Sequence, residues 1–236
     1  MVKLSGEGLS GKNGRLDPEA VSTIAEDLKK VLEGGTQVAI VVGGGNFLRG
    51  NALPWVHRTV ADQMGMLATV INGLALQDRL EQSGIPTRVL SAVTIAALCE
   101  PFIRRRCIRH LEKGRVVVLV GGIGNPYFTT DSAAALRASE IGADCLLKGT
   151  QVDGVYAEDP HKNPAAERYG TLSYREVLSR ELKVLDTAAV VLCMENRIPI
   201  LVFNLHRKGN LVRACRGEAV GTWIFDGTSK PKVSRS

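Results

Sequence analysis

Three glycine-rich stretches carry the residue types that bind phosphate groups. They read KLSGEG at 3–8, GGGNFLRG at 43–50 and GGIGNPYFTT at 121–130. Backbone N–H groups can approach a phosphate oxygen closely where no Cβ intervenes, and a following helix adds a favourable dipole. Two of the stretches also hold a cation, Lys3 or Arg49, which can neutralise phosphate charge. The three stretches predict an anion site, with phosphoryl transfer as its chemistry.

The glycines do not follow the two commonest nucleotide-binding patterns. The sequence contains no G-x-x-x-x-G-K-[ST] motif. The G-x-G-x-x-G pattern fails because Leu48 and Tyr127 stand where it requires glycine. A phosphate site in this protein would therefore be neither a G-x-x-x-x-G-K-[ST] loop nor a G-x-G-x-x-G turn.

Four carboxylates are available to orient a lysine or to help place Mg²⁺: Asp62, Asp131, Asp153 and Asp159. Simpler structural roles compete with this chemistry. Asp62 and Asp131 stand where helix N-caps are expected, and the other two lie in D-G and D-P turn contexts. The residues alone leave both interpretations open.

The elements that must position these groups alternate between strand and helix. Apolar, β-rich runs occur at 36–45, 115–122, 143–148 and 198–204. Strands that are apolar throughout are typical of a parallel sheet covered by helices on both faces. The fold class is therefore α/β, with a doubly covered sheet.

The helices have clear start and stop signals. Asp17 and Pro18 predict the start of one helix, and Gly34 or Gly35 its end. A second helix is predicted over 61–84, and three more over 101–114, after Asp131, and over 185–196. The second helix carries an apolar stripe that we expect to pack in the core: Met64, Leu67, Ile71, Leu74 and Ala75. The polar stretch 150–173 is predicted to be a long functional loop.

The composition limits the classes of protein to which this sequence can belong. The 44% hydrophobic and 23% charged fractions are those of a globular protein, and no apolar run is long enough to span a membrane. The five cysteines lie far apart, which predicts reduced, buried thiols and a cytoplasmic location. Nucleic acid is an unlikely partner despite the net charge of +6, because aromatic residues are only 5%. The basic cluster from Arg104 to Arg109 is interpreted as a solvated helix face or a subunit contact.

The ordered motifs resemble those of bacterial uridylate (UMP) kinases, within the amino-acid kinase family. The motifs are KLSGE, VVGGGNFLRG, ADQMGMLATVINGLALQD, GNPYFTTDSAAALRASEIGAD, LLKGTQVDGVYAEDP and LKVLDTAA. The resemblance extends from Lys3 to about Thr222. It implies a three-layer αβα sandwich with a mainly parallel central sheet. It also implies transfer of the γ-phosphoryl group of ATP to UMP, directly and in line, with Mg²⁺.

The resemblance also assigns roles by motif. The implied catalytic residues are Lys3, Arg49, Asp131, Lys183 and Asp186, with Asp131 organising the lysines. The implied ATP-binding residues are Lys3, Leu4, Ser5, Gly6, Gly45, Arg49, Thr150, Tyr156 and Asp159. The implied UMP-binding residues are Gly44, Asp62, Ile123, Gly124, Asn125, Pro126, Tyr127, Phe128, Thr129 and Thr130. No residues are assigned as ligands of a resident metal.

Assembly and organisation follow from the same resemblance. It implies a homohexamer, activation by GTP and inhibition by UTP, although segment 8–19 lacks the aromatic residue usual there. The single domain divides into a UMP-binding part at about 1–148 and an ATP-binding part at about 149–236. Only Met1 and Val2 precede Lys3, which predicts a short first strand with Lys3 near a frayed end.

Two alternatives remain open from the sequence. One is a related kinase that phosphorylates an acid, of the carbamate or acetylglutamate type, since such enzymes share the glycine loops. The other is a non-catalytic relative that senses nucleotides or stores anions.

Overall fold

A nine-stranded sheet forms the centre of the molecule in the part of the chain that the structure, a computed structural model, describes: residues 1–11, 16–48, 54–158, 160, 162–163 and 165–227. The strands are β1 (Val2–Leu4), β2 (Ala39–Val42), β3 (Thr87–Ser91), β4 (Glu100–Pro101), β5 (Val116–Val120), β6 (Leu146–Thr150), β7 (Thr171–Leu172), β8 (Ile200–Asn204) and β9 (Gly221–Ile224). Their order is β4-β3-β5-β2-β1-β6-β8-β9-β7. Neighbouring strands are parallel except for the β8–β9 pair.

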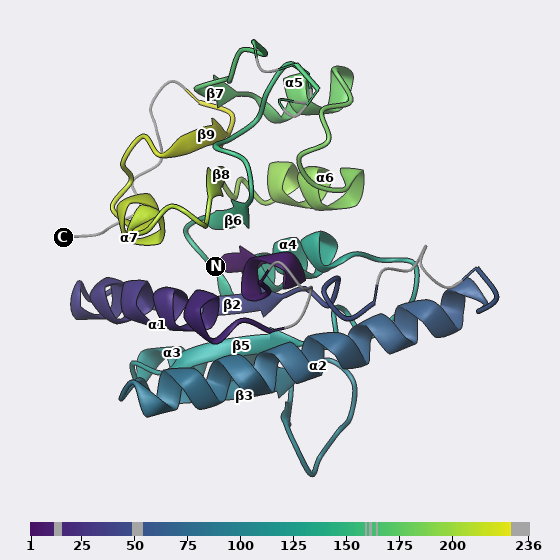
Figure 1. Cartoon of the computed structure of the whole chain (residues 1–236), viewed down its shortest axis with the longest axis vertical. Coiled ribbons are helices and arrows are strands. Elements are labelled where there is room, and N and C mark those ends of the chain that lie inside the picture. The colour runs from purple at the N-terminus through teal and green to yellow at the C-terminus, as the bar shows by residue number, and fades with distance from the viewer. Residues whose placement is uncertain (12–15, 49–53, 159, 161, 164, 228–236) are drawn as a thin grey trace.

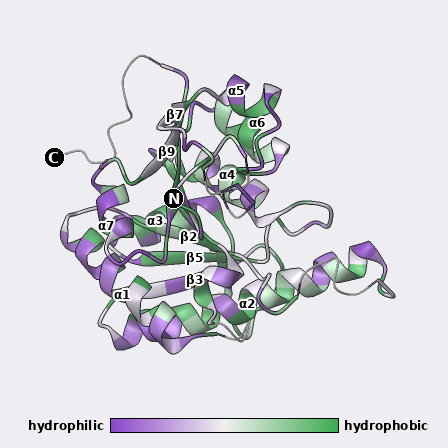
Figure 2. Ribbon diagram, turned by 45° about the horizontal axis from the view of Figure 1, so that its top comes forward, coloured by the Kyte–Doolittle hydropathy of each residue, from purple (hydrophilic) through white to green (hydrophobic). Residues whose placement is uncertain are grey.

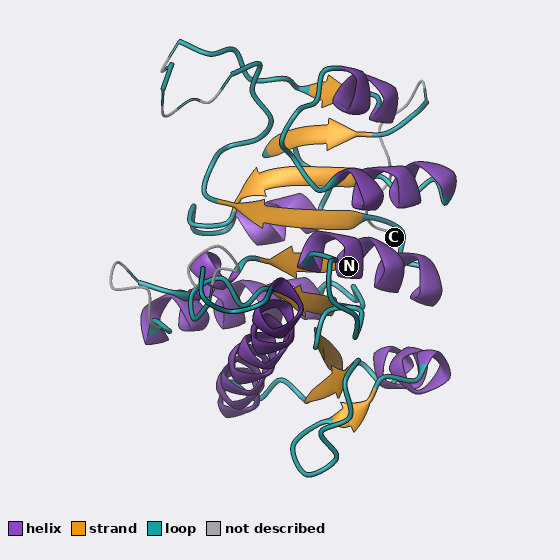
Figure 3. Ribbon diagram, turned by 90° about the vertical axis from the view of Figure 1, so that its right-hand side faces the viewer, coloured by secondary structure: helices purple, strands orange, loops and turns teal. Residues whose placement is uncertain are grey.

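Helices cover both faces of this sheet (Figures 1 and 3). They are α1 (Pro18–Glu33), α2 (Arg58–Gln82), α3 (Arg104–Glu112), α4 (Thr130–Ile141), α5 (Tyr174–Ser179), α6 (Thr187–Glu195) and α7 (Asn210–Cys215), with a short 3-10 helix η1 (Gly6–Leu9) after β1. Two separate hydrophobic clusters lie above and below the sheet. One contains residues of α1, α2 and α7, and the other residues of α3 to α6.

Strand residues alternate between the two clusters, as the pleat of a strand requires. In β5, Val116, Val118 and Val120 belong to the first cluster, while Val117 and Leu119 belong to the second. Figure 2 shows this strand as uniformly hydrophobic. The predicted three-layer αβα fold with a mainly parallel sheet is confirmed.

The prediction that Lys3 lies near a frayed end is wrong. β1 lies between β2 and β6, where Val2 pairs with Ile40 on one side and with Leu147 on the other. Strands paired on both edges cannot fray readily, because their backbone groups would lose partners on two sides. Lys3 is accordingly only 8% exposed.

The predicted signals of the first helix are confirmed. Asp17 is the N-cap of α1, and its side chain accepts a hydrogen bond from Glu19 N at 3.0 Å. Pro18 is the first residue of the helix, which ends at Gly34.

The apolar stripe predicted to pack α2 into the core is exposed at three of its positions. Met64, Leu67 and Ile71 are 37%, 53% and 49% exposed. The residues that face the sheet are mainly small or polar: Ala61, Ala68, Thr69, Val70, Asn72, Gly73, Leu76 and Leu80. The reason is close approach, since a Cβ on Gly73 would come within 2.3 Å of Val120 Cγ1. The helix comes closest to the sheet where its side chains are small.

The arginines of α3 lie on its exposed side, over a buried face of Cys107, His110 and Leu111. Two of them are neutralised in part: Arg106 pairs with Glu100 and Arg109 with Glu112. Ile103 is exposed, because it precedes the helix as its N-cap residue.

The cysteines are free and buried, as predicted. Burial raises the pKa of Cys107 to about 11, so this thiol stays protonated near neutral pH. None of the helices in the described ranges has both the length and the hydropathy that a membrane crossing requires.

Candidate functional site

The predicted site residues that the structure describes lie mainly at one edge of the sheet, where parallel strands β1, β2, β5 and β6 have their carboxyl ends. The glycine loops follow β1, β2 and β5 directly in the chain. Open α/β sheets bind ligands outside the carboxyl ends of their strands. The topology therefore brings together segments that lie more than a hundred residues apart.

Two lysines and one carboxylate form the centre of this edge. Lys3 and Lys148 face each other as register partners on β1 and β6. Asp131 lies between them, with its Oδ1 2.9 Å from Lys3 Nζ and its Oδ2 2.6 Å from Lys148 Nζ. Lys148 also donates a hydrogen bond to the carbonyl of Val184. Like charges on neighbouring strands repel, so the carboxylate is what allows the two ammonium groups to lie side by side.

The electrostatics of this cluster follow from its burial. Burial alone would raise the pKa of Asp131, but the charges of Lys3 and Lys148 outweigh it and hold the pKa below its usual value. Burial lowers the pKa of Lys148, against the opposing effect of the Asp131 carboxylate. The cluster brings two amino groups to one carboxylate, an excess of basic over acidic groups that suits an anionic ligand.

The capping role weighed for Asp131 and Asp62 is wrong. Thr129 caps α4 and His57 caps α2. Asp131 turns instead to the two lysines, and Asp62 accepts a hydrogen bond from Tyr127 N at 2.8 Å. Neither carboxylate therefore caps a helix.

Asp186 connects two helices near the cluster. Its side chain caps α6 by accepting from Ala189 N at 2.7 Å. It also accepts hydrogen bonds from the hydroxyls of Thr129 and Ser132 at the start of α4. The structure therefore shows Asp186 fixing the amino end of α4, on which Asp131 lies.

The first two glycine loops touch through their backbones. A Cβ on Gly6 would come within 2.4 Å of Asn46 Oδ1 and 2.7 Å of Gly45 N. A Cβ on Gly43 would come within 2.9 Å of Gly6 N. Only glycine permits this contact, so the two loops act as one backbone-lined surface. Leu4 and Ser5 lead into it, and Ser5 Oγ accepts from Gly8 N at 3.1 Å.

A cavity of about 280 Å³ lies between α2 and the third glycine loop. Six of the predicted UMP-binding residues line it: Asp62, Ile123, Asn125, Phe128, Thr129 and Thr130. Gly44 stands behind it, where a Cβ would come within 2.8 Å of Gly65 O on α2. Gly124 and Pro126 belong to the same turn but do not line the cavity.

Tyr127 does not line the cavity either. Its backbone is left-handed, with φ of 71°, and its ring lies under the Arg58 guanidinium at 4.9 Å. Its hydroxyl lies 3.2 Å from Thr59 Oγ1. It ties the third glycine loop to the amino end of α2.

A second cavity, of about 410 Å³, lies beside the end of β6 and the segment from Arg180 to Val184. Three predicted residues line it: Thr150, Tyr156 and Lys183. Val184 also lines it, and this is the residue whose carbonyl Lys148 contacts. Arg49 and Asp159, both predicted site residues, lie outside the described residues.

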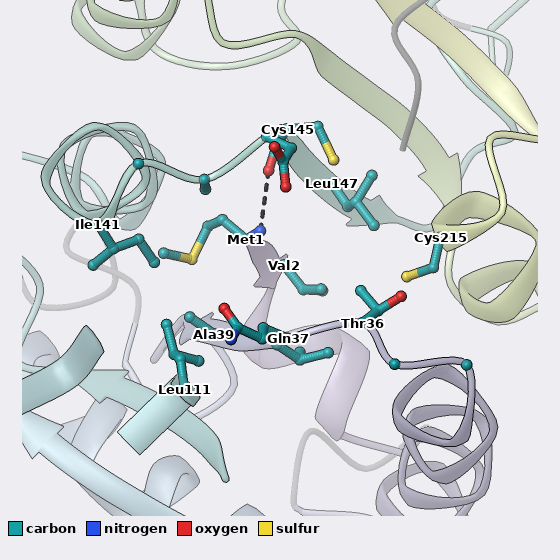
Figure 4. A pocket seen from close by; sticks show the side chains of 16 residues that line it. Met1, Val2, Thr36, Gln37, Ala39, Leu111, Ile141, Cys145, Leu147 and Cys215 are labelled. Atoms are coloured by element: carbon teal, nitrogen blue, oxygen red, sulfur yellow. Dashed lines mark hydrogen bonds between the residues drawn. The ribbon is translucent and has the colours of Figure 1, made fainter. Parts of the chain in front are cut away.

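A third cavity, of about 250 Å³, lies at the opposite edge, among the amino ends of β1, β2 and β6. Figure 4 shows Cys145 and Cys215 there, and the hydrogen bond from the Met1 amino group to Cys145 O, 3.0 Å long. Apart from that amino group, its lining residues carry one charged side chain, Asp144. It lacks the converging cations of the carboxyl edge.

Sequence reasoning missed Lys148. The signal was present, because Lys148 directly follows the apolar residues Cys145, Leu146 and Leu147 and lies in the motif LLKGTQVDG. A lysine on a central strand of a covered sheet needs a buried partner. Its pairing with Asp131 depends on register across β1 and β6, which no local pattern encodes.

Comparisons with known proteins agree with this geometry. A sequence profile described as the amino acid kinase family matches residues 1–204. The crystal structure of UMP kinase from Bacillus anthracis is similar, with a TM-score of 0.93 and 37% identity over 96% of this chain and 95% of that one. UMP kinase from Ureaplasma parvum gives 0.91 and 38% over 95% and 97%. Uridylate kinase from Archaeoglobus fulgidus gives 0.72 and 29% over 94% and 99%. The chain belongs to the amino acid kinase family.

Proposed function

We propose that this protein is a UMP kinase, which transfers the γ-phosphoryl group of ATP to UMP and so forms ADP and UDP. The observation that carries the proposal is that the lysine cluster adjoins residues that line two different cavities. Asp131 directly follows Thr130, which lines the cavity beside α2. Lys148 contacts Val184, which lines the cavity beside β6. An acceptor in one cavity and a donor in the other would meet at the two ammonium groups.

The cavities differ in the way that this reaction requires. The cavity beside α2 offers Asn125 and the hydroxyls of Thr129 and Thr130 for a pyrimidine, with Asp62 for the ribose. The cavity beside β6 offers the flat ring of Tyr156 for adenine and Thr150 at its edge. Asp159 would complete the ATP side, and Lys183 would lie beside its phosphates.

The division of the chain follows from these assignments. Residues up to about 148 would form the UMP-binding part and those after it the ATP-binding part. Lys148 then lies at the boundary between them, where both substrates meet.

The chain's own residues would act mainly by position and charge. In phosphoryl transfer the protein holds donor and acceptor in line and stabilises charge on the moving phosphoryl oxygens. Lys3 and Lys148, with Arg49, would supply that positive charge. Asp131 would fix both ammonium groups, and the touching glycine loops would present backbone N–H groups to the two phosphate chains.

Magnesium would come with the nucleotide. Among the described residues, no group of three or more His, Cys, Asp or Glu side chains is placed to hold a metal ion. Asp131 and Asp186 are already bound by lysines and by hydroxyl and backbone N–H groups. The described residues therefore do not fit a protein-built magnesium site. Mg²⁺ commonly binds through substrate phosphates and water, so we infer that ATP carries it in.

A panel of acceptors tests the function. The purified protein with ATP and Mg²⁺ should phosphorylate UMP in preference to CMP and AMP. The amide and hydroxyl groups of the cavity beside α2 suit a pyrimidine, and the comparison with CMP tests whether that pyrimidine is uracil. ADP release is measured with each acceptor, including carbamate and N-acetylglutamate. Equal or faster turnover of CMP or AMP, or ADP release with an acid alone, would contradict the proposal. Adding GTP or UTP to the same assay checks the expected activation and inhibition.

We infer that the protein self-associates, as a homohexamer, through the exposed stripe of α2. Val60, Met64, Leu67 and Ile71 recur at helical spacing and are exposed along one side of this helix. Figure 2 shows α2 extending beyond the body of the molecule. A long apolar helix face of this kind fits a second copy across a two-fold axis, because the same face can pack against itself.

Leu67→Glu should break this contact. A charge in the middle of the stripe would be buried without a partner, so we expect the mass measured by light scattering to fall to that of a smaller species. Leu98→Glu is the matched control, since Leu98 is similarly exposed but belongs to the connection between β3 and β4. An unchanged mass for Leu67→Glu would place the interface elsewhere.

A further inference from the structure

Asn72 is a fully buried polar residue on the face of α2 that packs against the sheet. Its Nδ2 donates hydrogen bonds to Gly43 O at 2.6 Å and to Asn46 Oδ1 at 2.7 Å. Asn46 Nδ2 donates in return to Asn72 Oδ1 at 3.1 Å. The amide orientation follows from chemistry, because a backbone carbonyl can only accept. Both polar atoms of the Asn72 side chain therefore form hydrogen bonds with the second glycine loop.

An asparagine in this position is costly unless it does something specific. Burying an amide costs free energy unless hydrogen bonds replace its contacts with water. Its neighbours on the buried face, Ala68, Val70 and Leu76, fill the same layer without any polar group. The hydrogen bonds of Asn72 therefore contribute to the position of the loop rather than to filling the core.

The loop position set by Asn72 reaches the centre of the site. Asn46 Oδ1 is the atom closest to where a Cβ would stand on Gly6, so Asn46 lies between Asn72 and the first glycine loop. Gly43 N also donates to Leu4 O at 2.8 Å, directly after Lys3 on β1. One turn earlier on α2, Thr69 Oγ1 accepts from Gly121 N at 2.7 Å. One face of α2 therefore fixes the glycine loops that follow β2 and β5.

We propose that Asn72 is a positioning residue for phosphoryl transfer, which acts through Asn46 to hold the second glycine loop against the first. This rests on the proposed function, since the loops are taken to hold the phosphates of the two nucleotides. Asn72 itself is buried behind the loop and does not line either substrate cavity. Asn72 contributes to the reaction by holding the backbone N–H groups of the glycine loops in position.

The test compares three variants with a matched control. Asn72→Ala removes the hydrogen bonds between the Asn72 side chain and the second glycine loop. Asn72→Asp keeps the size of the side chain but loses both Nδ2 hydrogen-bond donors. Asn46→Ala removes the side-chain partner of Asn72 without opening a cavity in the core. Thr87→Ala is the control, because Thr87 is also fully buried and hydrogen-bonded to a backbone carbonyl, but at the amino end of β3. Thermal midpoints are measured together with kcat and KM for both substrates, well below each midpoint.

We expect kcat/KM for UDP formation to fall about 10- to 100-fold in each of the three variants, because small displacements of positioning groups have effects of that size. Thr87→Ala should keep kcat/KM within about twofold while losing a similar part of its thermal midpoint. The double variant Asn46→Ala/Asn72→Ala should be no slower than the slower single variant, since the two residues act as one unit.

The outcomes separate this proposal from the function on which it rests. If the unaltered protein forms no UDP, the proposed function fails before Asn72 is tested. If the unaltered protein is active and Asn46→Ala and Asn72→Asp keep full kcat/KM, Asn72 is only a core residue and the proposal is overturned. If the Asn72 variants fail to fold, kcat/KM of Asn46→Ala tests the proposal by itself: a fall supports it and an unchanged value overturns it.

Discussion

Replacing Lys3 with methionine should lower kcat for UDP formation by roughly 10²- to 10³-fold and leave the fold intact. The size is that of losing one preorganised donor to the charge that develops in the transition state. Methionine preserves the length of the side chain inside β1. Asp131 keeps Lys148 at 2.6 Å, so no buried charge is left without a partner. Stability should therefore change little.

Two companion variants make this result specific. Lys148→Met should cause a loss of similar size, because Lys148 mirrors Lys3 across Asp131. Arg137→Met is the control: Arg137 is also a buried, paired cation, with Glu140 at 2.6 Å, but it lies two turns further along α4. It should cost stability and not rate. Full kcat in Lys3→Met would remove Lys3 from the catalytic machinery.

Much of the fold could be predicted because its signals are local. The runs 36–45, 115–122, 143–148 and 198–204 became β2, β5, β6 and β8, since apolar β-rich runs have few alternatives in an α/β chain. Asp17 and Pro18 marked the start of α1 for an equally local reason. The predicted UMP-binding turn converged with Asp62 because parallel strands deliver their loops to one edge.

What the sequence could not supply depends on contacts between distant segments. The stripe on α2 has the period of a core face, and nothing in the helix itself shows that Gly73 rather than Leu67 meets the sheet. The partner of Asp131 is likewise a question of register between β1 and β6. The strands β3, β4, β7 and β9 were also missed; β4 and β7 have two residues each and lie at the two ends of the strand order.

Asp131→Asn should reduce both turnover and stability. Removing the carboxylate leaves two ammonium groups on neighbouring strands, with side chains only 10% and 14% exposed. Breaking a buried ion pair on one side is expected to lower the free energy of unfolding by about 3 kcal/mol. We expect kcat to fall by roughly 10²-fold as well, because the lysines lose the group that positions them.

The double variant Asp131→Asn/Lys148→Met distinguishes positioning from mere packing. Removing one of the two unpaired charges should recover most of the lost stability, as measured by urea unfolding, without recovering turnover. If the double variant turned over as fast as Lys148→Met alone, Asp131 would contribute to stability only.

The same carboxylate should make stability depend on pH in the acid range. The pKa of Asp131 is held below its usual value in the folded protein, because Lys3 and Lys148 outweigh the effect of burial. Its contribution is therefore complete above the unfolded-state pKa of about 4 and is lost as the pH falls through the lower folded value. Below about pH 4 the unfolding free energy of the unaltered protein should fall more steeply than that of Asp131→Asn. Parallel curves for the two proteins in urea titrations between neutral and acid pH would show that the lysines do not stabilise the Asp131 carboxylate, because a group with the same pKa in both states adds no slope.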